Sequence, residues 1–185
     1  MGNLVADAMR AKYPGVEAAV TNSGGLREDF LVAHALGGEQ PGEITWGEAF
    51  AVLPFGNFMV VETLTGAQLT AAFQNGLKPP CGDVAGGTGR TPQFSGLKVT
   101  YHCNGTVPVV DSIVRGSSPT PLTPTDTIRI VTNDFMYTGG DGYTAFTGGT
   151  AVEQHPEDPL LNVLIEYIKA HSPIAPVVEG RRVGP

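Results

Sequence analysis

Residues 16–27 read VEAAVTNSGGLR, an apolar segment that runs directly into a glycine turn and an arginine. Val16 to Thr21 is rich in valine and alanine, which favours a short buried strand. Asn22-Ser23-Gly24-Gly25 ends this strand abruptly, because asparagine, serine and glycine are turn formers. The stretch therefore predicts a buried strand followed by a glycine loop, and loops at the ends of sheet strands often form ligand crevices.

Helices and further strands surround this stretch. Leu4 to Tyr13 has a helical apolar face, and Pro14-Gly15 stops it. Capping boxes that begin at Thr45 and Thr65 start helices near 46–53 and 66–76. Periodicity and β-branched content predict the remaining elements, which are strands at 59–64, 97–103, 107–114 and 127–132 and a helix at 160–170. Strands interspersed with helices predict one mixed α/β domain over residues 1–185.

Two long segments lack such patterns. Lys78 to Gln93 is rich in proline, glycine and threonine, and Asp134 to Thr150 contains five glycines. Long loops inside compact domains are usually functional or tethered. We therefore expect both segments to contribute to a site or to be held by other parts of the chain.

Composition and charge exclude several classes of protein. The 185 residues are 41% apolar, which is ample for a core. Eleven basic residues face eighteen acidic ones, a net charge of −7 that disfavours binding to nucleic acid. No run of 18 apolar residues occurs, so we expect no membrane span.

The two cysteines, Cys81 and Cys103, lie 22 residues apart. They are either unrelated thiols or one disulfide of an exported protein, and the second interpretation is favoured. A zinc site is poorly supported, since only His102 lies close by and there is no second Cys-x-x-Cys pair.

Catalytic motifs are missing from the sequence. There is no Gly-x-Ser-x-Gly elbow, no phosphate-binding Walker loop and no His-Glu-x-x-His. The four histidines, His34, His102, His155 and His171, are scattered. Asp141 is a candidate base, but a carboxylate in a Gly-Gly-Asp-Gly turn more often holds the turn or accepts hydroxyl hydrogen bonds. The chain alone is therefore predicted to be inactive, with no catalytic residue and no metal.

Binding is better supported, because three polar segments interrupted by glycine follow strands. They are Asn22 to Arg27, Gln93 to Gly96 and Asn133 to Tyr143. Arg27 offers a forked donor for phosphate or carboxylate, although it is equally compatible with an ordinary surface arginine. An aromatic residue together with Asp141 suits a nucleoside, since the ring stacks on a base and the carboxylate accepts from ribose hydroxyls. The structural alternative is that Phe135 belongs to the core and that the glycines only turn the chain.

In this order and spacing, the motifs resemble the C-terminal, substrate-binding domain of the 5'-nucleotidase family over nearly the whole chain. The resemblance rests on Gly2-Asn3-Leu4 with Asp7-Ala8, Asn22 to Arg27, Ile44-Thr45, Leu53-Pro54-Phe55-Gly56-Asn57, Gln93 to Leu97, Thr132 to Phe135, Gly139 to Gly142, and Glu179-Gly180-Arg181.

The resemblance implies a mixed α/β fold in which layered sheets are covered by helices. It also implies that residues 1–185 lack the N-terminal metallophosphoesterase domain, which carries two divalent metal ions and the hydrolytic chemistry. This chain would hold the nucleoside or nucleotide for that domain and need no cofactor of its own. Full-length members are mostly exported, so we expect a secreted, cell-surface or periplasmic protein.

The same resemblance assigns site residues. Phe135 matches one aromatic of a clamp around the base, Asp141 the carboxylate for the ribose, Arg27 a phosphate-side arginine and Gln93 a polar contact near the base. The complete expected set is Gly25, Arg27, Asn57, Gln93, Phe94, Phe135 and Asp141.

Two positions depart from the expected pattern. We expect the second clamp aromatic at position 91, where this chain has Thr91, and some relatives carry an arginine where it has Thr65. Phe94 or Tyr137 offers a substitute for the missing aromatic, although the register of Phe94 matches a buried position. A different ligand, such as a cyclic nucleotide or nucleotide sugar, and a structural or interaction module that has lost nucleotide binding remain the alternatives.

Overall fold

A computed structural model describes residues 1–31, 39–85, 87–116, 118–175 and 177–185. Of the residues discussed above, His34 lies outside these ranges. No helix in the described ranges is long and apolar enough to cross a membrane.

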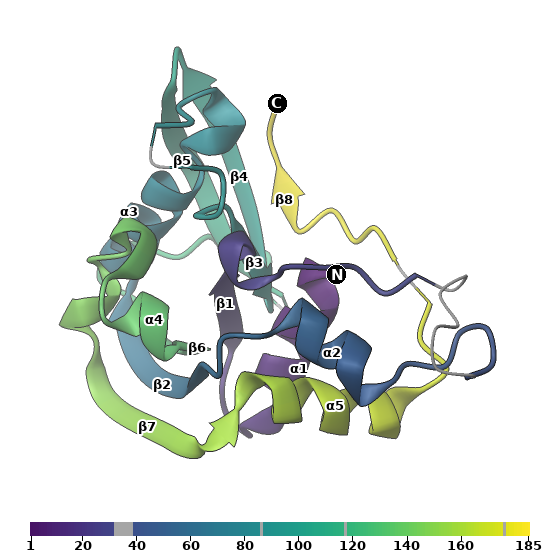
Figure 1. Ribbon diagram of the computed structural model, residues 1–185. Coiled ribbons are helices and arrows are strands. Elements are labelled where there is room, and N and C mark those ends of the chain that lie inside the picture. Colours follow the sequence, from purple (N-terminus) through teal and green to yellow (C-terminus); the bar gives the residue numbers. More distant parts are fainter. Residues whose placement is uncertain (32–38, 86, 117, 176) are drawn as a thin grey trace.

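A five-stranded sheet forms the centre of the fold (Figure 1). Its strands, in spatial order, are β3 (Pro92–Ser95), β1 (Ala18–Asn22), β6 (Thr127–Asn133), β2 (Phe58–Thr65) and β7 (Thr150–Pro159). β1 and β6 run parallel, whereas the other neighbours are antiparallel. The predicted buried strand is thus an inner strand, and all five of its residues are buried.

Three helices cover one face of this sheet. They are α1 (Gly2–Lys12), α2 (Trp46–Val52) and α5 (Leu160–His171), which lie together in Figure 1. Val5 and Met9 of α1 and Leu164 of α5 pack against Met59 and Val61 of β2 in one core cluster. These contacts explain the apolar faces that the sequence shows in α1 and α5.

The other face of the sheet carries a second layer. It contains α3 (Gly66–Gly76), α4 (Asp134–Tyr137) and a smaller sheet of β5 (Val107–Arg115), β4 (Leu97–Asn104) and β8 (Arg182–Val183). Phe73 of α3 joins a core cluster that includes Ile130 of β6 and Val99 of β4. The helix is therefore packed together with both sheets, and the predicted mixed α/β architecture of layered sheets covered by helices is confirmed.

The capping boxes begin their helices where the sequence indicates. The Thr65 hydroxyl accepts from the Gln68 amide at 3.2 Å, and the Gln68 side chain accepts from the Thr65 amide at 2.8 Å. Thr45 and Glu48 repeat this arrangement at the start of α2. As noted above, some relatives carry an arginine at position 65. In this chain, the Thr65 side chain caps the start of α3.

Three strands were not predicted, namely β3, β7 and β8. All three lie at sheet edges. β7 consists almost entirely of exposed residues and contains two prolines, so it lacks the alternation that marks a half-buried strand. Hydrogen bonds to a neighbouring strand, rather than a local pattern, define these elements.

Candidate functional site

Most of the predicted site residues lie at one end of the strands of the central sheet. Because β1 and β6 are parallel, their last residues, Asn22 and Asn133, lie at the same end of the sheet. β2 is antiparallel to β6 and begins there, with Met59 opposite Asn133. Three turns therefore meet at this end of the sheet, namely those that follow β1 and β6 and the one that precedes β2. We call this end of the sheet the loop edge.

A network of amide side chains holds Asp141 at the loop edge. The buried Asn22 donates through Nδ2 to Asp141 Oδ2 at 2.7 Å, and Asn133 Nδ2 donates to Asn22 Oδ1 at 3.2 Å. Asn75 of α3 donates to the backbone carbonyl of Asp141 at 2.9 Å. A carboxylate has about four lone-pair sites, so Asp141 can accept further bonds from a ligand while Asn22 orients it.

The backbone of Asp141 is also unusual. Its φ of 54° is in the left-handed region, which few residues other than glycine, asparagine and aspartate occupy. The flanking Gly139 and Gly142 also have positive φ. The glycines of this segment thus shape a tight turn that presents a carboxylate, as the Gly-Gly-Asp-Gly sequence predicts.

Phe135 lies beside this turn, and the residue is 41% exposed. A Cβ atom on Gly140 would lie 2.5 Å from the ring, so only glycine allows the backbone to approach this closely. The alternative expectation, that Phe135 belongs to the core, is wrong. One part of the ring rests on the glycine, and another part faces solvent.

Phe55 is a second exposed aromatic at the loop edge. The residue is 58% exposed, and the guanidinium carbon of Arg27 lies 5.7 Å from the ring centroid. Asn57 donates to Asp134 Oδ1 at 2.8 Å, and the Phe58 amide donates to the same oxygen at 3.2 Å. These bonds tie the turn that carries Phe55 to the helix that carries Phe135.

Two predicted residues are placed differently. The ring of Phe94 is 3% exposed and packs edge-on against Phe73, with centroids 4.9 Å apart. It belongs to the core, so its face is not available to stack on a ligand. The side-chain amide of Asn57 donates to Asp134, so Asn57 positions the turn.

Gln93 and Gly25 border the loop edge from the side of β3 and β1. Gln93 lies opposite Thr21 in the sheet, and its side chain lies against Gly2, where a Cβ atom would be 1.9 Å from it. Gly25 lies next to Asn22, with a Cβ position 3.4 Å from the Asn22 side-chain oxygen. Arg27 is exposed, and its backbone amide donates to Val52 at 2.9 Å.

Phe55, Asn22 and Asn133 are absent from the sequence-based site. Phe55 carried a usable signal, because a phenylalanine between Pro54 and Gly56 is poorly placed to enter a core. The two asparagines carried none beyond their position after strands. Their role depends on the parallel pairing of β1 and β6, which brings residues 111 positions apart into contact.

The predicted disulfide is present. Cys81, the last residue of a short 3-10 helix (Pro79–Cys81) after α3, is bonded to Cys103 in β4, and the bond closes a loop that contains β3 and the segment before it. Within that loop the carbonyls of Gly89 and Thr91 accept from the amides of Gly24 and Ser23. The disulfide thus joins two parts of the second layer and tethers a segment that supports the turn after β1.

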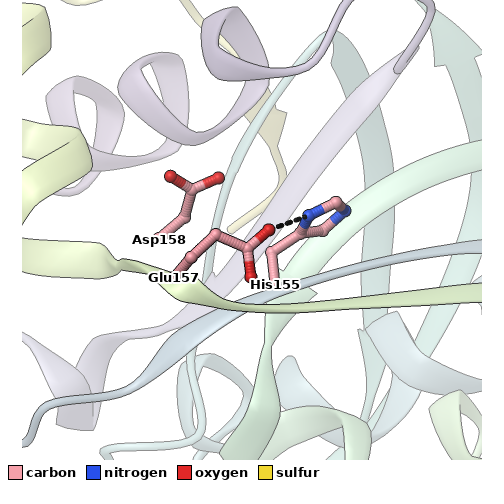
Figure 2. A group of neighbouring side chains, drawn as sticks. All are labelled: His155, Glu157 and Asp158. Carbon is pink, nitrogen blue, oxygen red and sulfur yellow. Dashed lines mark hydrogen bonds and ion pairs between the residues drawn. The ribbon is translucent and has the colours of Figure 1, made fainter.

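A separate group of His155, Glu157 and Asp158 has ligand atoms within 4.8 Å of one another (Figure 2). Figure 2 shows the Glu157 carboxylate turned toward the His155 ring, at 3.0 Å from Nδ1. Asp158 already accepts from Tyr13 at 2.7 Å and pairs with Lys12 at 3.2 Å. Burial opposes the charge of Asp158, but these two partners outweigh it and lower its pKa. The group is therefore an ion-pair network between β7 and α1, and we assign no metal ion to it.

The chain was compared with known proteins. The family model described as "5'-nucleotidase, C-terminal domain" matches residues 1–148. The chain is 35% identical to the trifunctional nucleotide phosphoesterase protein YfkN of Bacillus subtilis over 98% of its own length and 12% of that protein. It is 34% identical to the cell wall protein Lmo0130 of Listeria monocytogenes, over 99% of this chain and 23% of that protein.

Among solved structures, a 5'-nucleotidase precursor from Thermus thermophilus superimposes with a TM-score of 0.83 at 29% identity. The match covers 99% of this chain and 34% of that one. The chain thus spans between about an eighth and a third of the length of these relatives. Matches of both sequence and fold over nearly the whole chain show that it belongs to the 5'-nucleotidase C-terminal domain family.

Proposed function

We propose that this chain binds the nucleoside or nucleotide substrate of a 5'-nucleotidase-like hydrolase whose bond cleavage takes place in another domain. The observation that carries this proposal is the gathering of Phe55, Phe135, Asp141 and Arg27 at the loop edge. Exposed aromatic rings, an oriented carboxylate and a forked cation are the groups that a base, a ribose and a phosphate require.

The base stacks on Phe135 and Phe55 in this proposal. Both rings are exposed, and the Asn57–Asp134 contacts hold their turns together, so neither ring has to leave a core to receive a ligand. Base stacking is worth about 1 to 3 kcal/mol per aromatic. Thr91 therefore does not leave the site with one aromatic, because Phe55 supplies the second from a different turn. Gln93 contacts the polar edge of the base, and Gly25 lets the ligand approach the backbone closely.

The ribose is bound by Asp141. Asn22 holds one carboxylate oxygen, and Asn75 fixes the backbone of the same residue. A carboxylate that is already oriented loses little conformational freedom when it accepts a bond from a ribose hydroxyl. Asp141 thereby distinguishes ribosides from free bases.

The phosphate is bound by Arg27. The Phe55 ring under the guanidinium restricts its motion, and the N–H donors at its edge stay available for a planar, charge-assisted contact. Hydrolysis then belongs to an N-terminal metallophosphoesterase domain with two divalent metal ions in the full-length protein. No cofactor is assigned to this chain.

We further propose that the full-length protein is exported, to the cell surface, the periplasm or the medium. The Cys81–Cys103 disulfide supports this, because such bonds persist in oxidising compartments. The similarity to a protein described as a cell wall protein is a second, independent support.

Isothermal titration calorimetry with adenosine and AMP tests the proposal. We expect binding heats for both ligands, tighter binding of AMP, and no phosphate release by this chain. Arg27→Gln should remove the preference for AMP and leave adenosine binding in place. The absence of heat from both ligands at millimolar concentration would contradict the proposed function.

The competing candidate is an interaction module that has kept the fold and lost the ligand. Trp46 and Phe50 favour it, since their exposed rings stack on α2 with centroids 5.2 Å apart. Exposed aromatic groups of this kind often mark contact surfaces. In that case the chain gives no heat with adenosine or AMP, so the same titration separates the two functions.

A further inference from the structure

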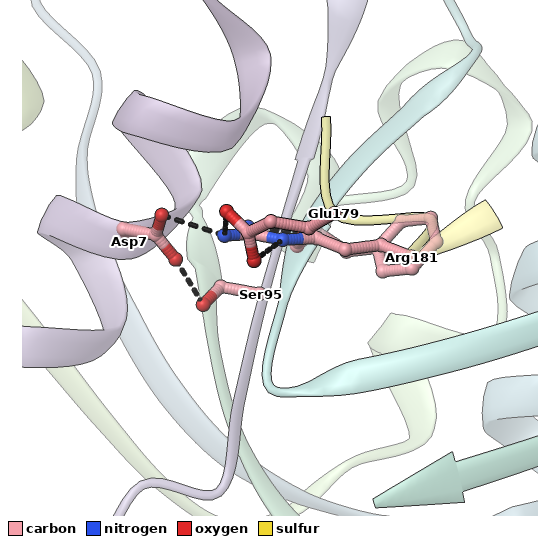
Figure 3. A network of polar contacts seen from close by, with 5 residues as sticks. Asp7, Ser95, Glu179 and Arg181 are labelled. Carbon is pink, nitrogen blue, oxygen red and sulfur yellow. Dashed lines mark hydrogen bonds and ion pairs between the residues drawn. The ribbon is translucent and has the colours of Figure 1, made fainter. Parts of the chain in front are cut away.

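Arg181, in the C-terminal segment, is the centre of a network of polar contacts with Asp7 and Glu179 (Figure 3). Its guanidinium donates to Asp7 Oδ2 at 2.7 Å and to the Phe94 carbonyl at 2.8 Å. It also binds Glu179 with two bonds, at 2.9 and 2.7 Å. Four of the five guanidinium N–H donors are therefore engaged, and the side chain is only 12% exposed.

These partners come from separate parts of the fold. Asp7 belongs to α1, Phe94 belongs to the edge strand β3, and β8 follows Arg181 directly and pairs with β4. The second oxygen of Asp7 accepts from the hydroxyl of Ser95, the next residue of β3. Arg181 and Asp7 thus hold two consecutive residues of β3, one through its backbone and one through its side chain. We call Asp7 and Arg181 the strand clamp.

Strand β3 needs such support. It has four residues, it is the outer strand of its sheet, and β1 is its sheet neighbour. An edge strand that is hydrogen-bonded along one side only opens more easily than an inner strand. The strand clamp therefore supplies contacts that a second neighbouring strand would otherwise provide.

The position of β3 matters at the loop edge. Gln93 is part of the strand, and Pro92 lies opposite Asn22, whose side chain orients Asp141. Immediately before the strand, the Thr91 carbonyl accepts from the amide of Ser23, in the turn after β1. A shift of β3 would therefore move Gln93 and the Asn22–Asp141 pair together.

We propose that Arg181 and Asp7 are positioning residues for the ligand site, which they influence through β3 without touching the ligand. The inference rests on the proposed function, because it concerns the same site. The largely covered guanidinium, its bonds to two separate elements and the direct pairing of β3 with β1 carry it.

Arg181→Lys and Asp7→Asn test the strand clamp. Lysine keeps the charge but lacks the planar fork, so it cannot bind Asp7 and the Phe94 carbonyl in the same geometry. Asparagine keeps the size of Asp7 and removes its charge. Adenosine affinity by calorimetry and amide hydrogen exchange at residues 93–95 and 21–25 are the two measurements, made at a temperature at which every variant is folded.

We expect adenosine affinity to fall about three- to tenfold in both variants, with faster exchange in both segments. Lys12→Gln is the matched control, because it removes another ion pair of α1, to Asp158 and Glu166, that does not involve β3. It should leave affinity and exchange unchanged. A purely structural role would lower the melting temperature of the strand-clamp variants without changing affinity in the folded state.

The outcomes separate this inference from the proposed function. If the unmodified chain binds adenosine and the strand-clamp variants bind it equally well, the positioning role is overturned and the proposed function stands. Unchanged exchange at residues 93–95 also overturns it. If the unmodified chain binds no nucleoside, the proposed function fails and the positioning role fails with it.

Discussion

At the level of single residues, the loop edge is built from side chains whose neighbours restrict them. Gly140 leaves room for the Phe135 ring, Arg27 lies over the ring of Phe55, and Asn22 fixes one oxygen of Asp141. Ligand binding to such groups costs little conformational entropy, because their rotamers are largely fixed before the ligand binds. Substitutions at these positions therefore test the proposed ligand contacts directly.

Removing either aromatic should weaken the binding of every base. Phe55→Ala and Phe135→Ala each remove a stacking surface worth about 1 to 3 kcal/mol, so adenosine affinity should fall about five- to a hundredfold. Calorimetric titration measures the change. Phe50→Ala truncates an exposed phenylalanine on α2, outside the proposed site, and is the control with unchanged affinity. Equal affinity for the unmodified chain and Phe55→Ala would remove Phe55 from the site.

Asp141→Asn should act selectively on the sugar. Asparagine tolerates the left-handed backbone conformation and can still accept from Asn22, so the turn is retained. A hydrogen bond to a charged group contributes about 1.5 to 3 kcal/mol, which predicts about a ten- to hundredfold loss of adenosine affinity. Adenine affinity should stay the same. Titration with both ligands checks this, and equal losses would contradict the assignment of Asp141 to the ribose.

At the level of elements, β2 carries an ionisable group inside the core. Glu62 is 0% exposed, and neither of its carboxyl oxygens has a hydrogen-bond partner among the described residues. A Cβ atom on Gly149 would lie 1.7 Å from one of these oxygens, so the carboxyl group packs directly against this glycine. Burial raises the pKa of Glu62 to about 8, because water no longer stabilises the charged form.

Glu62 should make the protein less stable as the pH rises. The folded state keeps the proton up to about pH 8, whereas the unfolded chain loses it near pH 4.5. The contribution to stability is therefore complete below pH 4.5 and is lost as the pH rises through about 8, with a slope of at most about 1.4 kcal/mol per pH unit. Urea unfolding between pH 5 and 9 measures this slope.

Glu62→Gln should remove this contribution, since glutamine does not ionise. Its unfolding free energy should fall less between pH 5 and 8 than that of the unmodified chain. Glu153→Gln on β7 is the matched control, because Arg129 lowers the pKa of that exposed carboxylate and it stays ionised over this range. Identical pH slopes for Glu62→Gln and the unmodified chain would show that Glu62 is ionised in the folded state.

At the level of the whole molecule, the disulfide and the strand clamp connect elements that lie far apart in the sequence. Cys81–Cys103 joins the segment after α3 to the smaller sheet, and Arg181 joins the C-terminal segment to α1 and to the central sheet. Both connections act on β3 and the segment before it. The support of the loop edge is therefore distributed over distant parts of the chain.

Removing the disulfide should destabilise the fold. A bond that closes a loop of this size contributes about 3 kcal/mol, mainly by restricting the unfolded chain. Cys81→Ala combined with Cys103→Ala should lower the unfolding free energy by about that amount in urea titrations. The unmodified chain in reductant should show the same loss, and the double variant should not respond to reductant. A response of the double variant would assign the effect to the reductant itself.

The sequence by itself determined the elements that local interactions define. The capping boxes at Thr45 and Thr65 began their helices correctly, and apolar periodicity located α1, α5 and most inner strands. These signals are visible in a sequence because a cap or a helical face involves residues three or four positions apart. Phe135 and Asp141 were proposed together as ligand contacts for a related reason, since both belong to the glycine-rich segment Asn133 to Tyr143.

Only the tertiary structure decided the strands β3, β7 and β8 and which side chains meet at the loop edge. β7 and β3 are strands because β2 and β1 lie beside them. Phe94 was assigned to the ligand by its neighbourhood in sequence, yet the packing of Phe73 against it places it in the core. Phe55 joins the site because antiparallel pairing of β2 with β6 brings its turn to Asp134. Contacts between residues far apart in the chain depend on how strands pair and layers pack, which local sequence patterns do not encode.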